Sequence, residues 1–201
     1  MIKNILCFFL MLVCLALPAD AKTLKGGVSL SWDNLTQTEI TRDIEKVREL
    51  IFGGGEIANK DKKELKAELQ EYKKDKNRVE NYMFASSGGG ELSDKIVVPF
   101  FYKKYLYAYG IIYKNDLKTC YYYTALGGLY YVEYFEKDYG NYPVVSHQYK
   151  KNGSFNAAVY NISDVDQYMY KKNSKFIGRW LNENYYDEHG KVVMTRTLPK
   201  K

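Results

Sequence analysis

Residues 149–155, Tyr149-Lys150-Lys151-Asn152-Gly153-Ser154-Phe155, set a pattern that the second half of this 201-residue chain repeats. Residues 170–176, Tyr170-Lys171-Lys172-Asn173-Ser174-Lys175-Phe176, align with them without a gap, and residues 186–192, Tyr186-Asp187-Glu188-His189-Gly190-Lys191-Val192, form a looser third copy. Each copy has an aromatic residue, a charged turn, a small residue and the apolar start of a strand. Asn-Gly is the strongest short signal for a β-hairpin. Spacing near 20 residues predicts stacked hairpins, each burying its face on the next.

The segments around these turns alternate between two faces, which is the period of a β-strand. Nineteen of the 21 tyrosines lie between Tyr102 and Tyr186, and tyrosine suits a pleated, half-buried surface. Residues 113–117 are a shorter, earlier echo of the repeat. Short strands joined by such turns predict an antiparallel β meander of six to eight strands.

The repeated unit resembles a known family. Gly178-Arg179-Trp180, then Tyr185-Tyr186 and Gly190-Lys191, is similar to the Gly-x-Trp, Tyr-Tyr and Gly-Lys pattern of the bacterial MORN-variant repeat, often described as an antitoxin component. The resemblance covers residues 149–196 and, more faintly, the stretch from residue 113. It implies an open sheet of hairpins that binds other molecules, and it carries over no catalytic residue.

The N-terminal third has a helical pattern instead. Residues 36–39, Thr-Gln-Thr-Glu, match a capping box, and an apolar stripe with helical spacing follows. Residues 53–55, three glycines, should end this helix, and a second helix is predicted over residues 60–84. The fold class predicted is therefore α+β: an N-terminal helical hairpin followed by an antiparallel β meander of repeated hairpins. The apolar stripe of the first predicted helix consists of Ile40, Ile44, Val47 and Ile51.

The first residues have the pattern of an export signal. Lys3 precedes an apolar run, 5–17, and residues 19–21, Ala-Asp-Ala, provide a cleavage site before Lys22. The run is short for a membrane span, and no other run reaches that length. We therefore expect a protein exported through a cleaved signal peptide, periplasmic or extracellular, without a transmembrane segment. Cys120 would then be the mature chain's one cysteine, which we interpret as a small buried hydrophobe.

The predicted organisation has four parts. They are a signal peptide over 1–21, a helical segment over 22–85, a Gly/Ser linker over 86–94, and a tyrosine-rich β-meander domain over 95–201. Neither glycine cluster, at residues 53–55 and 88–90, fits a nucleotide-binding motif. A net charge of +6 is too mild to indicate nucleic-acid binding.

The aromatic rows are the candidate binding site, because tyrosine buries area at an interface yet keeps a polar tip. The sequence favours a non-enzymatic binding module that presents its tyrosine-rich sheet to a protein partner. A carbohydrate ligand is the next alternative, and self-association through a sheet edge is another. The binding residues predicted are Tyr105, Tyr107, Tyr109, Tyr121, Tyr123 and Trp180.

Catalytic and metal-binding patterns are weak in this sequence. Glu133 and Glu136 could be paired carboxylates of a hydrolase, but nothing in the sequence fixes their separation. Asp164-x-Asp166 and residues 187–190 fit turns better than a cation site, and His147 lies beside a strand. We predict no catalytic residue, no metal ligand and no cofactor, and whether the protein is an enzyme stays open.

Overall fold

The computed structural model describes residues 37–53 and 60–198, with side chains from residue 42. The predicted signal peptide lies outside these residues, as do the start of the capping box and residues 22–36. Within the described residues, three short helices precede eleven strands, and their bounds are as follows: α2 Gln37–Phe52, α3 Lys62–Glu68, α4 Arg78–Ser86, β1 Gly90–Glu91, β2 Lys95–Tyr102, β3 Tyr105–Tyr113, β4 Thr119–Thr124, β5 Leu129–Phe135, β6 Val144–Lys150, β7 Phe155–Asn161, β8 Asp166–Tyr170, β9 Phe176–Leu181, β10 Asn184–Asp187, β11 Val192–Arg196.

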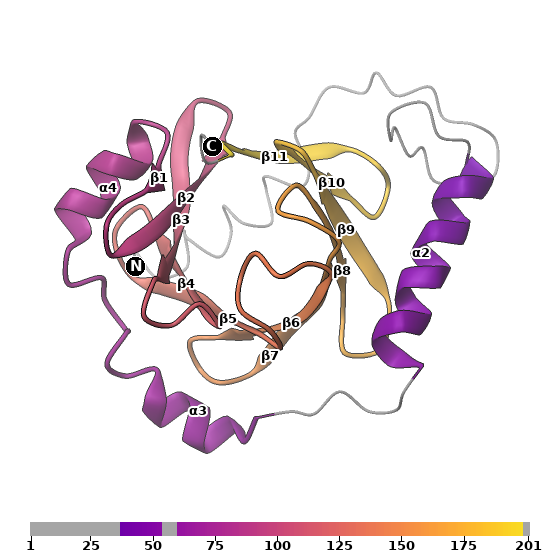
Figure 1. Cartoon of the computed structure of the whole chain (residues 1–201), viewed down its shortest axis with the longest axis horizontal. Helices are drawn as coiled ribbons and strands as arrows, with labels where there is room; N and C mark the ends of the chain where they lie inside the picture. The colour runs from indigo at the N-terminus through magenta and orange to yellow at the C-terminus, as the bar shows by residue number, and fades with distance from the viewer. Residues whose placement is uncertain (1–36, 54–59, 199–201) are drawn as a thin grey trace, which may run out of the picture.

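The sheet is a closed antiparallel barrel of ten strands, with β1 added beside β2. Each strand from β2 to β11 pairs with the next in sequence, and β11 returns to pair with β2 (Figure 1). The predicted α+β class is compatible with this architecture, but the open meander is not. Accumulated strand twist and tilt bring the first and last strands together, and closure then pairs both edges. The seam is short, since Arg196 and Thr195 pair with Phe100 and Phe101.

The predicted helical hairpin is wrong in two respects. The first helix, α2, packs against the barrel rather than against a second helix, and the second helix is divided in two. The residues expected to form one helix over 60–84 instead give α3 and α4, separated by a segment of turns with one isolated bridge residue, Lys74. That segment pairs with the β4–β5 turn, where the amide of Asp75 donates to the carbonyl of Gly127 at 2.8 Å. The buried Asp75 carboxylate accepts bonds from Asn81 and the Asn77 amide, which favours the break.

All three helices pack on the outside of the barrel (Figure 1). Leu65 of α3 and Ala85 of α4 lie in one core with Tyr109 and Tyr121, while Val47 of α2 lies in another with Tyr170. A short helix has little stability alone, and these three gain it from the barrel wall. The predicted 86–94 linker also belongs to this body, because it contains β1.

Four hairpin turns of the barrel share one hydrogen-bonded geometry. In the β4–β5, β6–β7, β8–β9 and β10–β11 turns, the first residue donates its amide to the carbonyl four residues on, and the fourth donates back to the first. The fourth residue has positive φ in every case, which glycine adopts without strain. The sequence analysis missed the first copy, and it placed an echo at residues 113–117, which lie at the other end. The four positive-φ residues are Gly127, Gly153, Ser174 and Gly190.

These four hairpins and the β2–β3 hairpin also share a β-bulge shortly after each turn. One extra residue in the second strand has no paired partner, which bends the strand and sharpens its twist. The bulges lie at the same end of the barrel as the turns, and repeated twist of this kind assists closure. The extra residues are Tyr107, Tyr130, Asn156, Ile177 and Val193.

Among the described residues, no helix is long and apolar enough to cross a membrane.

Candidate functional site

Three of the predicted binding tyrosines are buried on the outer face of the barrel wall, beneath α3, α4 and the segment between them. The hydroxyl of Tyr109 donates to the Asp75 carboxylate at 2.8 Å, and the ring of Tyr121 stacks on Tyr72 with centroids 4.1 Å apart. Tyr123 is 2% exposed and lies beside Tyr109. In this structure none of the three is accessible to a ligand at the surface.

Trp180, the predicted tryptophan, is buried inside the barrel. Its ring centroid lies 5.5 Å from that of Phe100, and the guanidinium of Arg196 lies 4.8 Å from its ring. Arg196 donates to Gln167 at 2.9 Å and to the backbone carbonyls of Asp164 and Asn182. Trp180 and Arg196 therefore fill the interior rather than a binding face.

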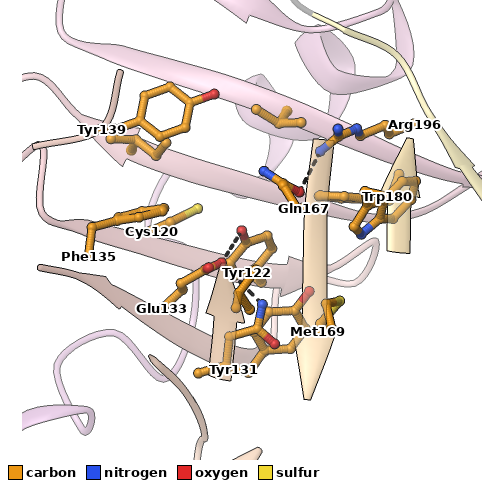
Figure 2. Close-up of a pocket in the computed structure, with 15 residues that line it drawn as sticks. Cys120, Tyr122, Tyr131, Glu133, Phe135, Tyr139, Gln167, Met169, Trp180 and Arg196 are labelled. Atoms are coloured by element: carbon orange, nitrogen blue, oxygen red, sulfur yellow. Dashed lines mark hydrogen bonds between the residues drawn. The ribbon is translucent and has the colours of Figure 1, made fainter. Parts of the chain in front are cut away.

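A buried carboxylate lies in the same interior (Figure 2). Glu133 accepts hydrogen bonds from Tyr122 at 2.6 Å, from Gln148 at 3.1 Å and from the hydroxyl of Ser146. Burial raises the pKa of Glu133, while these three bonds and the charge of Arg196 oppose the rise. These residues satisfy the hydrogen-bonding capacity of the Glu133 carboxylate. Such an arrangement is typical of a structural hydrogen-bond network.

The interior is nearly filled. The cavity lined by Glu133, Trp180 and Arg196 has a volume of about 40 Å³, enough for a few water molecules at most. Glu136, the other carboxylate of the hydrolase alternative, is exposed beyond the end of β5 and is not in the cavity lining. Cys120 is buried as expected, and burial raises the pKa of its thiol, which disfavours the thiolate.

The remaining two predicted tyrosines are exposed, and they lie at the end of the barrel that carries the repeated turns. Tyr105 is 67% exposed and Tyr107 39%. Tyr130, which the sequence analysis did not select, lies close to Tyr107 across β4, and both are bulge residues. Burial of its ring and the neighbouring Tyr130 hydroxyl raise the pKa of Tyr107 to about 12.

The turns at this end are rich in lysine. An up-and-down barrel places alternate turns at the same end, so the β2–β3, β4–β5, β6–β7, β8–β9 and β10–β11 turns gather there. We call this surface the lysine-rich end. It carries two carboxylates, Asp187 and Glu188, and Glu188 forms an ion pair with Lys175 at 2.8 Å. Its eight lysines are all exposed: Lys103, Lys104, Lys150, Lys151, Lys171, Lys172, Lys175 and Lys191.

The opposite end has the opposite balance. Its turns, with the β1–β2 connection, carry three lysines and six carboxylates. The turns of the barrel are therefore polarised along its axis, with an excess of positive charge at one end and of negative charge at the other. The carboxylates are Asp94, Asp116, Glu136, Asp138, Asp164 and Glu183.

A shallow cleft of about 300 Å³ opens at the lysine-rich end. Tyr130 and Tyr131 line one side, and Lys150 and Lys151 of the β6–β7 turn line the other. This combination of aromatic faces and ammonium groups can hold an anionic group by charge and an apolar or sugar surface by stacking.

The residues considered for metal binding are dispersed. Asp166 forms a bidentate pair with Arg179 at 2.8 Å, and Asp187 accepts backbone amides of its own turn. Within residues 42–53 and 60–198, no group of three or more His, Cys, Asp and Glu side chains could hold a metal ion. His147 is half-buried beside Phe155, and burial lowers the pKa of its imidazole.

The sequence analysis missed the lysines as a group. A signal was available, because Lys-Lys-Asn recurs in the copies at residues 150 and 171. The pattern was interpreted as turn chemistry, which is correct, but turn chemistry alone does not show that the turns share one end. That requires the hairpins to follow one another without a crossover and the barrel to close.

No protein-family model matches the sequence, and no curated protein or solved structure matches it either.

Proposed function

We propose that this protein is an exported, non-enzymatic binding module that holds a negatively charged target with its lysine-rich end. The observation that carries the proposal is the separation of charge: eight exposed lysines gather at one end of the barrel, while carboxylates predominate at the other. A single-sign surface steers an oppositely charged partner during its approach and raises the association rate.

The proposed binding surface, the lysine-rich end, differs from the tyrosine-rich sheet face that the sequence favoured. A tyrosine-rich sheet face is a poor candidate, because helices cover Tyr109, Tyr121 and Tyr123. Tyr105, Tyr107 and Tyr130 stay accessible, and they lie among the lysines. Contact residues of this kind supply apolar area and hydrogen-bonding tips where the lysines supply attraction.

The interior supports a structural role rather than catalysis. Its carboxylate, Glu133, is held by Tyr122, Ser146 and Gln148, and the cavity beside it holds a few water molecules at most. A hydrolase of the two-carboxylate type needs a second carboxyl group several ångströms away and room for a substrate between them.

The test is affinity capture with two matched charge-reversal variants. The chain from Lys22 onward is immobilised, envelope extract is passed over it, and bound protein, polysaccharide and lipid are identified. The first variant reverses Lys151, Lys171 and Lys172 to Glu, and the second reverses three lysines at the opposite end, Lys114, Lys118 and Lys137, to Glu.

We expect the first variant to lose the captured material and the second to retain it, although both have the same net charge. Equal loss in the two variants, or retention in both, would contradict the proposal. Circular dichroism and thermal melting confirm that each variant is folded before it is compared.

A further inference from the structure

We infer that the target of the lysine-rich end is the surface of a membrane containing anionic lipids. This inference rests on the proposed function and names the class of its target. Three features of the surface favour a lipid surface: its extent, the kind of cation that it uses, and the apolar side chains that lie between the cations.

The surface is a ring of turns rather than a pocket. Five hairpins end there, and four of their turns have the same hydrogen-bonded geometry, so the lysines are spread around the barrel. The cleft beside Tyr130 reaches two of the eight lysines. A small ligand in that cleft would leave the other six unused, whereas an extended charged plane can approach them together.

The cations of the turns are all lysines. The turns of the lysine-rich end contain no arginine, although two arginines of the helical part lie against them: Arg78 packs beside Gly127, and Arg48 donates to the carbonyl of Ser174. Arginine is the residue that recognises carboxylate or phosphate in a fixed bidentate geometry, and protein interfaces are depleted in lysine. A cluster of four to eight basic residues with flexible point charges is the pattern of attraction to anionic headgroups.

Apolar side chains project from the same turns. Leu126, at the tip of the β4–β5 turn, is 80% exposed, and Tyr105 at the start of β3 is 67% exposed. Val192, after the β10–β11 turn, is 41% exposed. Aromatic and aliphatic tips among lysines suit the headgroup region, where rings and methyl groups enter the interface and ammonium groups stay hydrated.

The carboxylates at the opposite end would orient the molecule. Anionic headgroups repel Asp116, Asp138 and their neighbours, so the barrel should stand on its lysine-rich end. The whole protein would then be a peripheral module whose covered outer wall is not needed for contact with the bilayer.

The test is sedimentation of the protein with vesicles of phosphatidylglycerol and phosphatidylcholine in equal parts, beside vesicles of phosphatidylcholine alone. The variants are the two triple charge reversals and Leu126→Ser. We expect the wild type to bind the anionic vesicles, and reversal of Lys151, Lys171 and Lys172 to weaken partitioning by about a hundredfold or more. Reversal of Lys114, Lys118 and Lys137 should not weaken it.

Salt separates the two parts of the surface. Rising ionic strength screens the lysines, so the binding that survives at high salt depends on apolar tips, and Leu126→Ser should remove most of it. If the wild type binds neither kind of vesicle but still captures a protein or polysaccharide, this inference is overturned and the proposed function is not contradicted. Failure to bind vesicles, protein and polysaccharide overturns both the inference and the proposed function. Equal weakening by the two charge reversals would show that binding follows net charge alone, which also overturns the inference.

Discussion

The two faces of the barrel wall are covered by different means. The inner face is covered by its own side chains, among them Phe100, Trp180 and the Glu133 network. Part of the outer face is covered by α2, α3 and α4, which lie on rows of tyrosine. This difference explains the high tyrosine content of the strands. Where the outer face contacts the helices, tyrosine rings supply apolar packing area, and tyrosine hydroxyls donate hydrogen bonds to polar groups of the helical segments.

The outer hydroxyls show this in detail. Tyr170 donates to the carbonyl of Ile44 in α2 at 2.7 Å, Tyr134 donates to Glu68 of α3 at 2.8 Å, and Tyr109 donates to Asp75. Phenylalanine could supply the same apolar area, but it would take one donor from each of these acceptors. The tyrosines thus hold the helices on the barrel by both packing and hydrogen bonding.

The largest expected effect comes from emptying the inner face. Trp180→Ala removes a side chain that packs on Phe100 and under Arg196, and it enlarges an interior that is nearly filled. We expect a loss of about 3–5 kcal/mol in the free energy of unfolding. Urea denaturation measures it, and a loss within the range of surface substitutions would mean that this interior is not the main core.

The outer face should respond less, and locally. Tyr109→Phe keeps the ring but takes one donor from the buried Asp75 carboxylate, at an expected cost of about 1–3 kcal/mol. Hydrogen exchange should show faster exchange in residues 69–86 while the barrel strands keep their protection. Uniform loss of protection would contradict the view that the outer layer is a separate attachment.

The Glu133 network gives the inner face a pH dependence. Because burial raises its pKa in the folded protein, Glu133 favours folding when protonated. Its contribution is complete below the unfolded pKa and is lost as pH rises through the folded pKa. Glu133→Gln should remove this dependence, so the stability of the wild type relative to the variant should increase as pH falls from neutral toward 4.

The control for that experiment is a carboxylate whose pKa shifts the other way. Lys175 lowers the pKa of the half-buried Glu188, so Glu188→Gln should not reproduce the effect. Chemical denaturation of the three proteins across this pH range is the measurement. Parallel stability curves for wild type and Glu133→Gln would contradict the prediction.

The smallest effect on stability is expected at the exposed tyrosine of the lysine-rich end. Tyr105→Ser removes a ring that is 67% exposed, and the free energy of unfolding should change by no more than about 0.5 kcal/mol. The same substitution in buried Tyr123 should cost several times more. Thermal melting of the two variants tests the contrast, and similar losses would show that exposure does not separate the two tyrosines.

The sequence predicted the hairpins, because their signals are local. Asn152-Gly153 and the alternating tyrosines report on neighbouring residues, and the turn geometry follows from them. Closure of the barrel was not predictable in this way, since the pairing of Thr195 with Phe101 joins segments far apart in the chain. For the same reason, strand alternation separated two faces but could not show that helices cover one of them.

The candidate surface was predictable only in part. Tyr105 and Tyr107 were selected with Tyr109 because all three alternate onto one side of a strand. A β-bulge at Tyr107 and the course of α4 then separate exposed from buried members of that row. Long-range packing decides that separation, and no pattern within a single strand contains it.

The seam between β11 and β2 has a consequence for the order of assembly. Two residue pairs join these strands, while eight join β2 to β3. Every other strand pairing in the barrel links neighbours in sequence, so hairpins can form one after another as a growing sheet. The ring cannot close until residue 196 reaches residue 100, and until then β11 and the part of β2 that β1 does not pair with have edges open to other strands. The interval before closure is therefore when a chaperone or a second chain could most readily capture this protein.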